Sequence, residues 1–447
     1  MKPILEIVPE EPQLAPPFSE EGLALQFAAR HVNDLRHVAQ WGRWMIWDGL
    51  RWQNDTKRTV YSMSRELCRE AAAQQDKPAW ASKLATASKR AAVLSLASDD
   101  PQLAATVDRW DADPWLLNTP GGVVDLRSGA LRPGRPEDYI TKVTAVAPGG
   151  DCPTWVRFLA RVTGEAPDLQ AFMKRIAGYA LTGLTSEHAL FFLHGLGANG
   201  KSVFISTVAG MMGHYHRTAA IETFTASHTE RHPTELAMLH GARLVTATET
   251  EEGRPWAESR IKTLTGGDRI SARFMRMDFF EFTPQFKLLI AGNHRPGVRS
   301  VDEAMRRRLH LVPFGVTIPK EERDPGLADR LREEWPGILS WAIEGCLEWQ
   351  GRGLAPPPAV TSATADYLDA EDSFATWLDE CCSLDRAAQT AVGLLYESWS
   401  SWADGAGERP GSRKRFSQTL EARGFSPVRG DHRGFRGIKL KPNGPTL

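Results

Sequence analysis

The sequence predicts an α/β protein built on a mostly parallel sheet. Three short apolar runs, residues 189–195, 242–248 and 286–292, have the length and continuous hydrophobicity of strands buried on both faces. Segments with helical spacing lie between or near these runs, and such alternation is typical of a parallel sheet covered by helices. The first run also leads directly into a glycine-rich motif, which favours the same architecture.

Composition excludes several classes of protein. Hydrophobic residues make up 42% and charged residues 24% of the 447-residue chain, which is ordinary for globular proteins and excludes a mostly disordered chain. No run of 18 apolar residues is present, so neither a membrane-spanning helix nor a membrane partner is expected. The five cysteines form no CxxC pair, which argues against a disulfide framework and a cysteine zinc site and fits a reducing cytoplasm.

The charge balance also limits how the chain could bind nucleic acid. The formal net charge is −1, from 54 Lys and Arg against 55 Asp and Glu. Any attraction to a polyanion must therefore be local rather than a property of the whole chain.

The chain divides into six predicted segments. The N-terminal segment is acidic and proline-rich and lacks the pattern of a signal peptide, so it is expected to be a short disordered tail. Next come mixed helical and turn-rich sequence, a helical collar, the α/β core, a helical segment ending in a Pro-rich linker (351–360), and a small C-terminal domain. The predicted boundaries are 1–19, 20–150, 151–186, 187–320, 321–371 and 372–447.

The strongest motif follows the first apolar run. It fits GxxxxGK[ST] and precedes an apolar helical segment, which is the context of a phosphate-binding P-loop. Backbone N–H groups and the helix N-terminus would surround the phosphates, Lys201 would reach the β- and γ-phosphates, and Ser202 would bind Mg²⁺. ATP and Mg²⁺ are therefore the expected cofactors. The motif residues are Gly195, Leu196, Gly197, Ala198, Asn199, Gly200, Lys201 and Ser202.

Polar residues follow the other two apolar runs. Glu249 comes directly after the second run, where a carboxylate can orient Mg²⁺ or activate water; Glu251 and Glu252 are rivals because strand registers are uncertain. Asn293 follows the third run and could position water beside the γ-phosphate, or could simply form a turn.

Three consecutive arginines, Arg306, Arg307 and Arg308, precede a fourth strand-like segment, residues 309–314. Considered alone, they fit a solvated basic surface better than an arginine finger that reaches a neighbouring subunit's γ-phosphate.

Together, these motifs resemble superfamily 3 helicases, the AAA+ branch found in small viruses, phages and plasmids. The resemblance is closer to phage and plasmid primase-helicases with the poxvirus-type helicase module. Residues 117–144 resemble the family's N-terminal helicase-associated domain, residues 249–296 its core, and residues 377–403 its appended helical or winged-helix domain. In all, the resemblance covers roughly residues 18–440.

The resemblance implies a fold and a set of roles. The fold is an AAA+ P-loop NTPase core with a mixed α+β N-terminal domain and a winged-helix-like C-terminal domain. Lys201 and Ser202 correspond to Walker A, Glu249 to the Walker B acid and Asn293 to the sensor. The finger corresponds to Arg307 or Arg308, because the family often has an apolar residue where this chain has Arg306.

A β-hairpin is predicted between the acidic strand and the sensor strand, over residues 266–282. The family uses such a hairpin to hold single-stranded DNA in the channel of a ring. Arg273, Arg276 and Arg269 would lie on the hairpin or at its tip, where a few cations per subunit form a charged funnel. A surface hairpin with solvated arginines is the alternative.

Three further features of the sequence each allow two interpretations. Residues 405–441 hold ten Lys and Arg against three acids, a local net charge of +7, which fits either a DNA-binding winged helix or a protein-docking domain. The tryptophans at 41, 44, 47 and 52 could stack on bases, but packing in a small β-rich subdomain is favoured for Trp41, Trp44 and Trp52. Asp111 and Asp113 form a DxD pattern, but their context argues against a primase metal site.

The predicted function is that of an ATP-driven DNA helicase from a phage, prophage or plasmid. It would form a homo-oligomeric ring, with a hexamer expected, on single-stranded and forked duplex DNA in a bacterial cytoplasm, with 3′-to-5′ movement implied by the resemblance. A separate primase is a further candidate partner. The alternatives are a primase-helicase that makes primers and a non-translocating AAA+ initiator that binds an origin.

Overall fold

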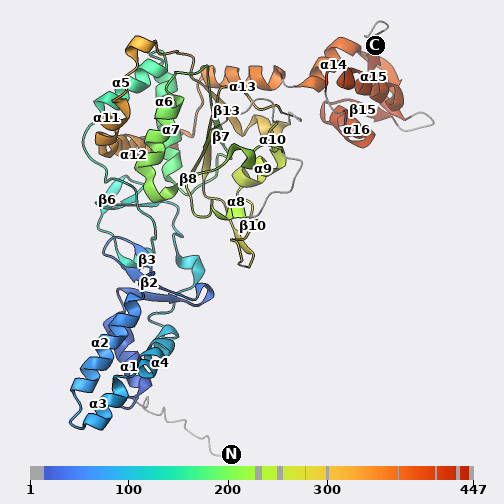
Figure 1. Cartoon of the computed structure of the whole chain (residues 1–447). Coiled ribbons are helices and arrows are strands. Elements are labelled where there is room, and N and C mark those ends of the chain that lie inside the picture. The colour runs from blue at the N-terminus through green and yellow to red at the C-terminus, as the bar shows by residue number, and fades with distance from the viewer. Residues whose placement is uncertain are drawn as a thin grey trace, which may run out of the picture.

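The structure is a computed structural model of the chain, and it describes residues 15–226, 234–248, 255–276, 278–298, 302–370, 372–407, 410–428 and 433–441. Figure 1 shows the N-terminal helices gathered at one end, a helix-covered sheet in the middle and a small C-terminal unit at the other end. Within these ranges, no helix combines the length and apolar character needed to cross a membrane.

The N-terminal unit combines four helices with a small sheet. Helix α1 (Glu20–Arg30) begins after Ser19, whose hydroxyl accepts a hydrogen bond from the backbone N–H of Gly22 at 2.9 Å. The other helices are α2 (Thr59–Ala73), α3 (Pro78–Leu84) and α4 (Ala87–Ser98), and the antiparallel strands are β1 (Leu35–Val38), β2 (Arg43–Trp47) and β3 (Trp52–Asn54).

Of the three tryptophans predicted to pack, Trp44 and Trp52 do so and Trp41 does so only in part. Trp52 is fully buried against the rings of Trp110 and Tyr139, and Trp44 contacts the rings of Phe27 and His37. Trp41 lies 5.9 Å from Trp110, ring to ring, but keeps 40% of its surface exposed.

The turn-rich stretch that follows forms a second small antiparallel sheet. Its strands are β4 (Leu116–Thr119), β5 (Gly122–Asp125) and β6 (Ala130–Arg132), in the order β4-β5-β6. Gly122 needs to be glycine, because it has φ +127° and an added Cβ would lie 2.4 Å from the carbonyl oxygen of Arg132.

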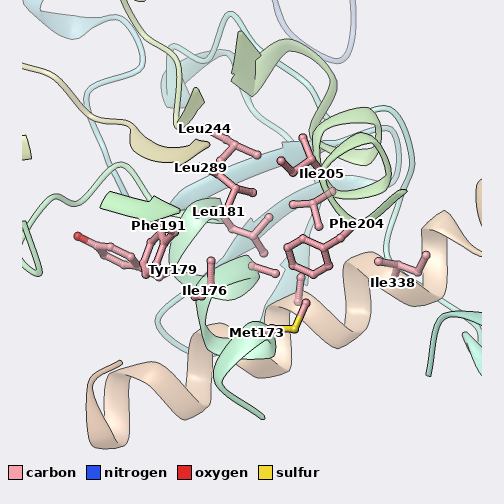
Figure 2. Packing of buried hydrophobic residues seen from close by; sticks show 14 of the residues in the cluster. Met173, Ile176, Tyr179, Leu181, Phe191, Phe204, Ile205, Leu244, Leu289 and Ile338 are labelled. Atoms are coloured by element: carbon pink, nitrogen blue, oxygen red, sulfur yellow. The ribbon is translucent and has the colours of Figure 1, made fainter. Parts of the chain in front are cut away.

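The predicted helical collar is present as α5 (Pro153–Val162) and α6 (Pro167–Leu181), which packs on α12 (Trp335–Arg352). Two glycines allow close contact between these helices: a Cβ on Gly178 would lie 2.1 Å from the backbone nitrogen of Cys346, and one on Gly345 would lie 2.2 Å from the carbonyl oxygen of Lys174. Figure 2 shows side chains of α6, the central sheet and α12 meeting in one apolar cluster.

The central sheet has five parallel strands. They are β7 (Leu190–His194), β8 (His216–Thr218), β9 (Leu244–Thr248), β12 (Lys287–Gly292) and β13 (Leu309–Pro313), in the order β13-β7-β12-β9-β8. The three predicted apolar strands and the strand after the arginines are therefore confirmed; β8 was not predicted. Alternate residues of β7 belong to apolar clusters on opposite faces of the sheet, which explains its continuous hydrophobicity.

Short helices complete the core. They are α7 (Lys201–Met212), α8 (Thr234–Ala237), α9 (Glu258–Gly266), α10 (Glu303–Arg306) and α11 (Leu327–Glu333).

The Pro-rich stretch differs from the prediction of a linker over 351–360. Helix α12 continues to Arg352, and Pro358 begins a new helix, α13 (Pro358–Ala370), because proline is well tolerated in the first helical turn. Helix α13 is also not a free spacer: its Thr364 hydroxyl accepts a hydrogen bond from the backbone of Leu311 on β13 at 2.9 Å.

The C-terminal unit has its own apolar core. It consists of α14 (Ser373–Cys381), β14 (Cys382–Ala391), α15 (Val392–Gly405), α16 (Arg413–Ala422), β15 (Ser426–Val428) and β16 (Gly434–Leu440), with the strands in the antiparallel order β14-β16-β15. All residues of its core cluster lie between 374 and 440. Phe416 and Leu420, predicted as a core pair, are both buried.

Candidate functional site

The glycine-rich loop joins β7 to α7, as the motif predicts. Ala198 and Gly200 have φ of 60° and 88°, so the backbone reverses within the loop. Two glycines are sterically required: a Cβ on Gly195 would lie 2.2 Å from the carbonyl oxygen of Phe314, and one on Gly200 would lie 2.6 Å from Val162. The buried Asn199 donates from its amide to the carbonyls of Leu196 and Phe314, which ties the loop to the end of β13.

Lys201 is the first residue of α7 and is 6% exposed. Its ammonium donates to the carbonyl of Gly195 and, at 3.1 Å, to the side-chain oxygen of Asn293. The structure thus brings together the two residues predicted as the Walker A lysine and the sensor, which are 92 positions apart in the chain. Burial lowers the pKa of Lys201, because the charged form loses hydration.

Sheet order explains this contact. Strand β12 lies between β7 and β9, with Gly292 paired to His194 and Ala291 paired to Thr248. The carboxyl ends of the three strands therefore lie at one edge of the sheet, where ligands of open α/β sheets usually bind.

The predicted acid follows one of these three strands in the sequence. Glu249 directly follows Thr248, the last residue of β9. Glu249 and its rivals Glu251 and Glu252 lie outside the described residues.

The three arginines lie at the opposite edge of the sheet and differ in their surroundings. Arg308 is buried; its guanidinium donates to the hydroxyl of Thr265 at 3.2 Å and to the carbonyl of Ala304 at 2.9 Å. Arg306 pairs with Asp369 of α13 at 2.9 Å. Arg307 is exposed, and its side chain makes no hydrogen bond or ion pair with the residues that the structure describes.

The predicted hairpin is present. Strands β10 (Ile270–Ala272) and β11 (Phe280–Phe282) pair antiparallel, and Figure 1 shows the hairpin extending away from the sheet. Arg269 and Arg276 are exposed, whereas the half-buried Arg273 has its guanidinium 4.8 Å from the ring of Phe279.

The hairpin also exposes apolar side chains, which was not predicted. Phe274, Met275 and Phe279 are 39%, 72% and 58% exposed. Their alternation with arginines at a turn was the available signal. The tip therefore offers cations and apolar surface together.

Two ionisable neighbours of the loop were not predicted. The pKa of His194, the last residue of β7, is lowered to about 4 by burial and by the charges of Arg295 and Lys201. Arg295 follows Asn293 by two positions, is exposed, and contributes positive charge to this edge. Its position just past a strand end was the available signal.

The DxD residues have structural roles. The carboxylate of Asp111 accepts hydrogen bonds from Thr141 and from the ammonium of Lys142, and Asp113 accepts from Arg127 and the backbone of Trp115. Within the described ranges, no group of three His, Cys, Asp or Glu side chains is arranged to hold a metal.

The C-terminal positive charge is partly neutralised. Arg423 pairs with Asp372 at 2.5 Å and Lys439 with Asp385 at 3.0 Å. Arg413 and Lys414, at the start of α16, are exposed.

Two protein-family models match separate parts of the chain. The family described as "D5 N terminal like" matches residues 24–164, and a family of unknown function matches residues 193–308. The first match overlaps the predicted helicase-associated domain. The second contains the glycine-rich loop, Asn293, the hairpin and the three arginines.

Curated viral proteins are related in sequence. One from Acanthamoeba polyphaga mimivirus is 26% identical over 321 residues, covering 65% of this chain and 33% of the relative. One from Frog virus 3 (isolate Goorha) is 24% identical over 381 residues, covering 65% of this chain and 39% of the relative. Both carry the name "Putative helicase", and this chain spans well under half of their length.

Two solved structures of the NrS-1 C-terminal region share the fold. Their TM-scores are 0.50 and 0.52 at 9% sequence identity. The similarity covers 96% and 94% of this chain and 100% and 99% of theirs. At 9% sequence identity, the similarity shows a shared arrangement of helices and strands.

Proposed function

We propose that the chain is an ATP-driven DNA helicase of the superfamily 3 AAA+ type. The observation that carries the proposal is the contact between Lys201 and Asn293 at the carboxyl edge of β7 and β12. A phosphate-binding lysine beside a polar strand-end amide can both hold a γ-phosphate and position the water that attacks it. The names of the viral relatives support a helicase. Its place in the replication of a phage, prophage or plasmid in a bacterial cytoplasm is part of the proposal.

The loop residues fit ATP with Mg²⁺. Backbone N–H groups of residues 195–202 and the N-terminus of the 12-residue helix α7 would hold the phosphates. Lys201 would neutralise phosphate charge, and the exposed hydroxyl of Ser202 would bind Mg²⁺ together with Glu249. When bound, Mg²⁺ supplies charge stabilisation, while Asn293 orients the attacking water.

A ring accounts for the position of Arg307. This exposed arginine lies just before β13, and the first residue of β13 pairs with the first residue of β7. The glycine-rich loop lies at the other end of β7, after its last residue. Five residues of strand, about 16 Å, separate the two edges. Arg307 would therefore serve a neighbouring subunit's ATP, which supports a closed homo-oligomer, with a hexamer as the proposed size.

Two regions would hold DNA. The hairpin carrying Arg269, Arg273 and Arg276 would grip single-stranded DNA in the ring. The C-terminal unit has the helix–strand–helix–helix–strand–strand order of a winged helix, with exposed cations at the start of α16, and would contact duplex DNA or a partner such as a separate primase.

Unwinding of a forked duplex tests this function. The wild type should unwind the fork with ATP and Mg²⁺, moving 3′ to 5′, and Lys201→Ala should lose both hydrolysis and unwinding while remaining folded. Ser206→Ala, on an exposed position of the same helix, is the matched control and should behave as the wild type. ATP hydrolysis without unwinding would instead indicate a non-translocating initiator, and ATPase of Lys201→Ala near the wild-type rate would refute the loop assignment.

A further inference from the structure

A cavity of about 540 Å³ lies in the N-terminal unit, apart from the loop, the hairpin and the arginines. It opens between the small sheet and helices α2 and α4. The volume falls in the range usual for small-ligand sites. Its lining residues are His37, Gly42, Arg43, Trp44, Asn54, Asp55, Arg58, Tyr61, Ala91, Leu94, Ser95 and Ser98.

The charge of the lining favours an anion. Arg43 and Arg58 are exposed at the cavity, and neither makes an ion pair with the described residues. Asp55 is the one acid among the lining residues, and its carboxylate is already engaged: its oxygens accept the backbone N–H groups of Thr59 and Val60 at 2.8 and 3.0 Å. Asp55 therefore caps α2, and neither guanidinium group is neutralised by an acid of the described residues.

Two aromatic rings line the same cavity. The half-buried Trp44 is held by the ring of His37 at 4.9 Å and by the ring of Phe27 at 6.5 Å. The half-buried Tyr61 has the guanidinium of Arg58 at 4.1 Å from its ring centroid. Tyr61 thus lies beside a cationic group, and Trp44 is held in place by two neighbouring rings.

We propose that this cavity binds a nucleotide, with its phosphate on Arg43 and Arg58 and its base against Trp44 or Tyr61. Guanidinium groups bind phosphate through paired hydrogen bonds, and aromatic rings stack on any base. The serines and Asn54 of the lining can hydrogen-bond a sugar or base edge. The nucleotide is either one unit of single-stranded DNA or a free nucleoside triphosphate. The cavity contains no residue of the glycine-rich loop, so binding there should not require ATP hydrolysis.

Photocrosslinking tests the assignment in the full-length chain. One arm uses a thymidine oligonucleotide with a 5-iodouracil base, and the other uses 5-iodo-dUTP; mass spectrometry then identifies the modified peptide. A crosslink at Trp44 or Tyr61 is expected. If the oligonucleotide crosslinks even in excess ATP, the ligand is a DNA strand. If only 5-iodo-dUTP crosslinks and the oligonucleotide does not, the ligand is a free nucleotide.

Charge-removal variants give a second readout. In Arg43→Ala/Arg58→Ala the crosslink should fall at least about fivefold, and if DNA is the ligand the salt slope of single-strand binding should fall by about 1.4, or 0.7 per lost phosphate contact. Arg65→Ala removes an exposed charge from α2 outside the cavity and should change neither value. The proposal would be overturned if no crosslink formed in the cavity and the double variant kept the wild-type salt slope. ATP hydrolysis and unwinding test the helicase proposal and do not depend on this result.

Discussion

At the scale of single residues, the arginines before β13 are distinguished by burial. The sequence left the finger open between Arg307 and Arg308, because neighbouring arginines have the same chemistry. In the fold, Arg308 is 6% exposed and its guanidinium binds Thr265 and Ala304, whereas Arg307 is exposed. A group fixed inside its own subunit cannot reach a neighbour's nucleotide, so Arg307 is the better candidate.

Two variants should separate these roles. Arg308→Ala should lower the free energy of unfolding by about 1–3 kcal/mol, since buried partners lose their hydrogen bonds. Arg307→Ala should change stability by less than about 0.5 kcal/mol yet abolish ATP hydrolysis in assembled rings. Urea unfolding and steady-state ATPase measure the two effects.

Mixing experiments address whether Arg307 acts between subunits. Adding Arg307→Ala to wild-type protein should reduce ATPase more than in proportion to its fraction, because each site needs its neighbour. A linear mixing curve, together with an active monomer, would exclude action in trans.

A half-buried histidine gives a pH prediction. His310 on β13 packs its ring against Phe191 at 5.5 Å, and burial lowers its pKa to about 4. The unfolded chain takes up this proton near pH 6.5, so between about pH 6.5 and 4 the unfolded state binds more protons than the folded state. Stability should therefore fall as the pH is lowered through that window.

His310→Phe should remove this histidine's share of the acid destabilisation, on the order of 2 kcal/mol. Urea unfolding of both proteins at pH 7 and pH 4.5 measures the difference. An equal loss of stability in the two proteins would contradict the assignment. His194 and His216, whose pKa values are also lowered to about 4, should keep part of the slope in the variant.

At the scale of elements, the sequence could predict what depends on local pattern. Continuous apolar runs identified β7, β9 and β12, and the GxxxxGK[ST] spacing identified the loop before α7. Sheet order depends on packing between distant segments, so nothing local revealed that β12 lies between β7 and β9. The contact of Lys201 with Asn293 follows from that order. The prediction for 351–360 was too wide because proline marks both linkers and helix starts.

The hairpin gives a prediction for the element as a unit. Arg276 is exposed beyond β10, so Arg276→Ala should weaken single-strand binding equally for all sequences and lower the salt slope by about 0.7 per engaged subunit. Arg273→Ala should do the same and should also release the ring of Phe279. Binding isotherms over a salt series measure both.

The matched control is Arg332→Ala, because Arg332 is an exposed arginine on α11, away from the hairpin. It should leave the slope unchanged. ATPase without DNA should survive in all three variants, since the hairpin is not part of the nucleotide site. If both hairpin variants keep the wild-type slope, the DNA grip lies elsewhere.

At the scale of the whole molecule, charge is distributed by unit. The chain carries a net charge of −1, yet exposed cations gather at the hairpin, at the N-terminal cavity and at the start of α16. Electrostatic attraction to a polyanion acts over about 10 Å at ordinary salt, so local clusters matter more than the total. Separate contact regions could therefore act on DNA without a basic chain.

The C-terminal unit should be removable if the cut is placed by its core. Its apolar cluster contains only residues between 374 and 440, and Asp372 belongs with it, because this residue caps α14 and pairs with Arg423. A chain ending at Ala370 keeps α13 on β13 and should retain ATPase and single-strand binding. Its binding to forked or double-stranded DNA should fall.

Deletion of residues 405–447 should destabilise the protein more than the longer deletion of residues 371–447. It would keep Trp377 and Leu395 but remove Phe416 and Ile438, which pack in the same cluster, so buried apolar surface would become exposed. The shorter deletion should therefore aggregate or melt at lower temperature, although it removes less of the chain. Thermal unfolding and light scattering compare the two proteins, and salt-dependent binding to single-stranded and forked DNA follows for the soluble one. If the chain ending at Ala370 lost single-strand binding while its ATPase persisted, the main DNA contact would lie in the C-terminal unit and not in the hairpin.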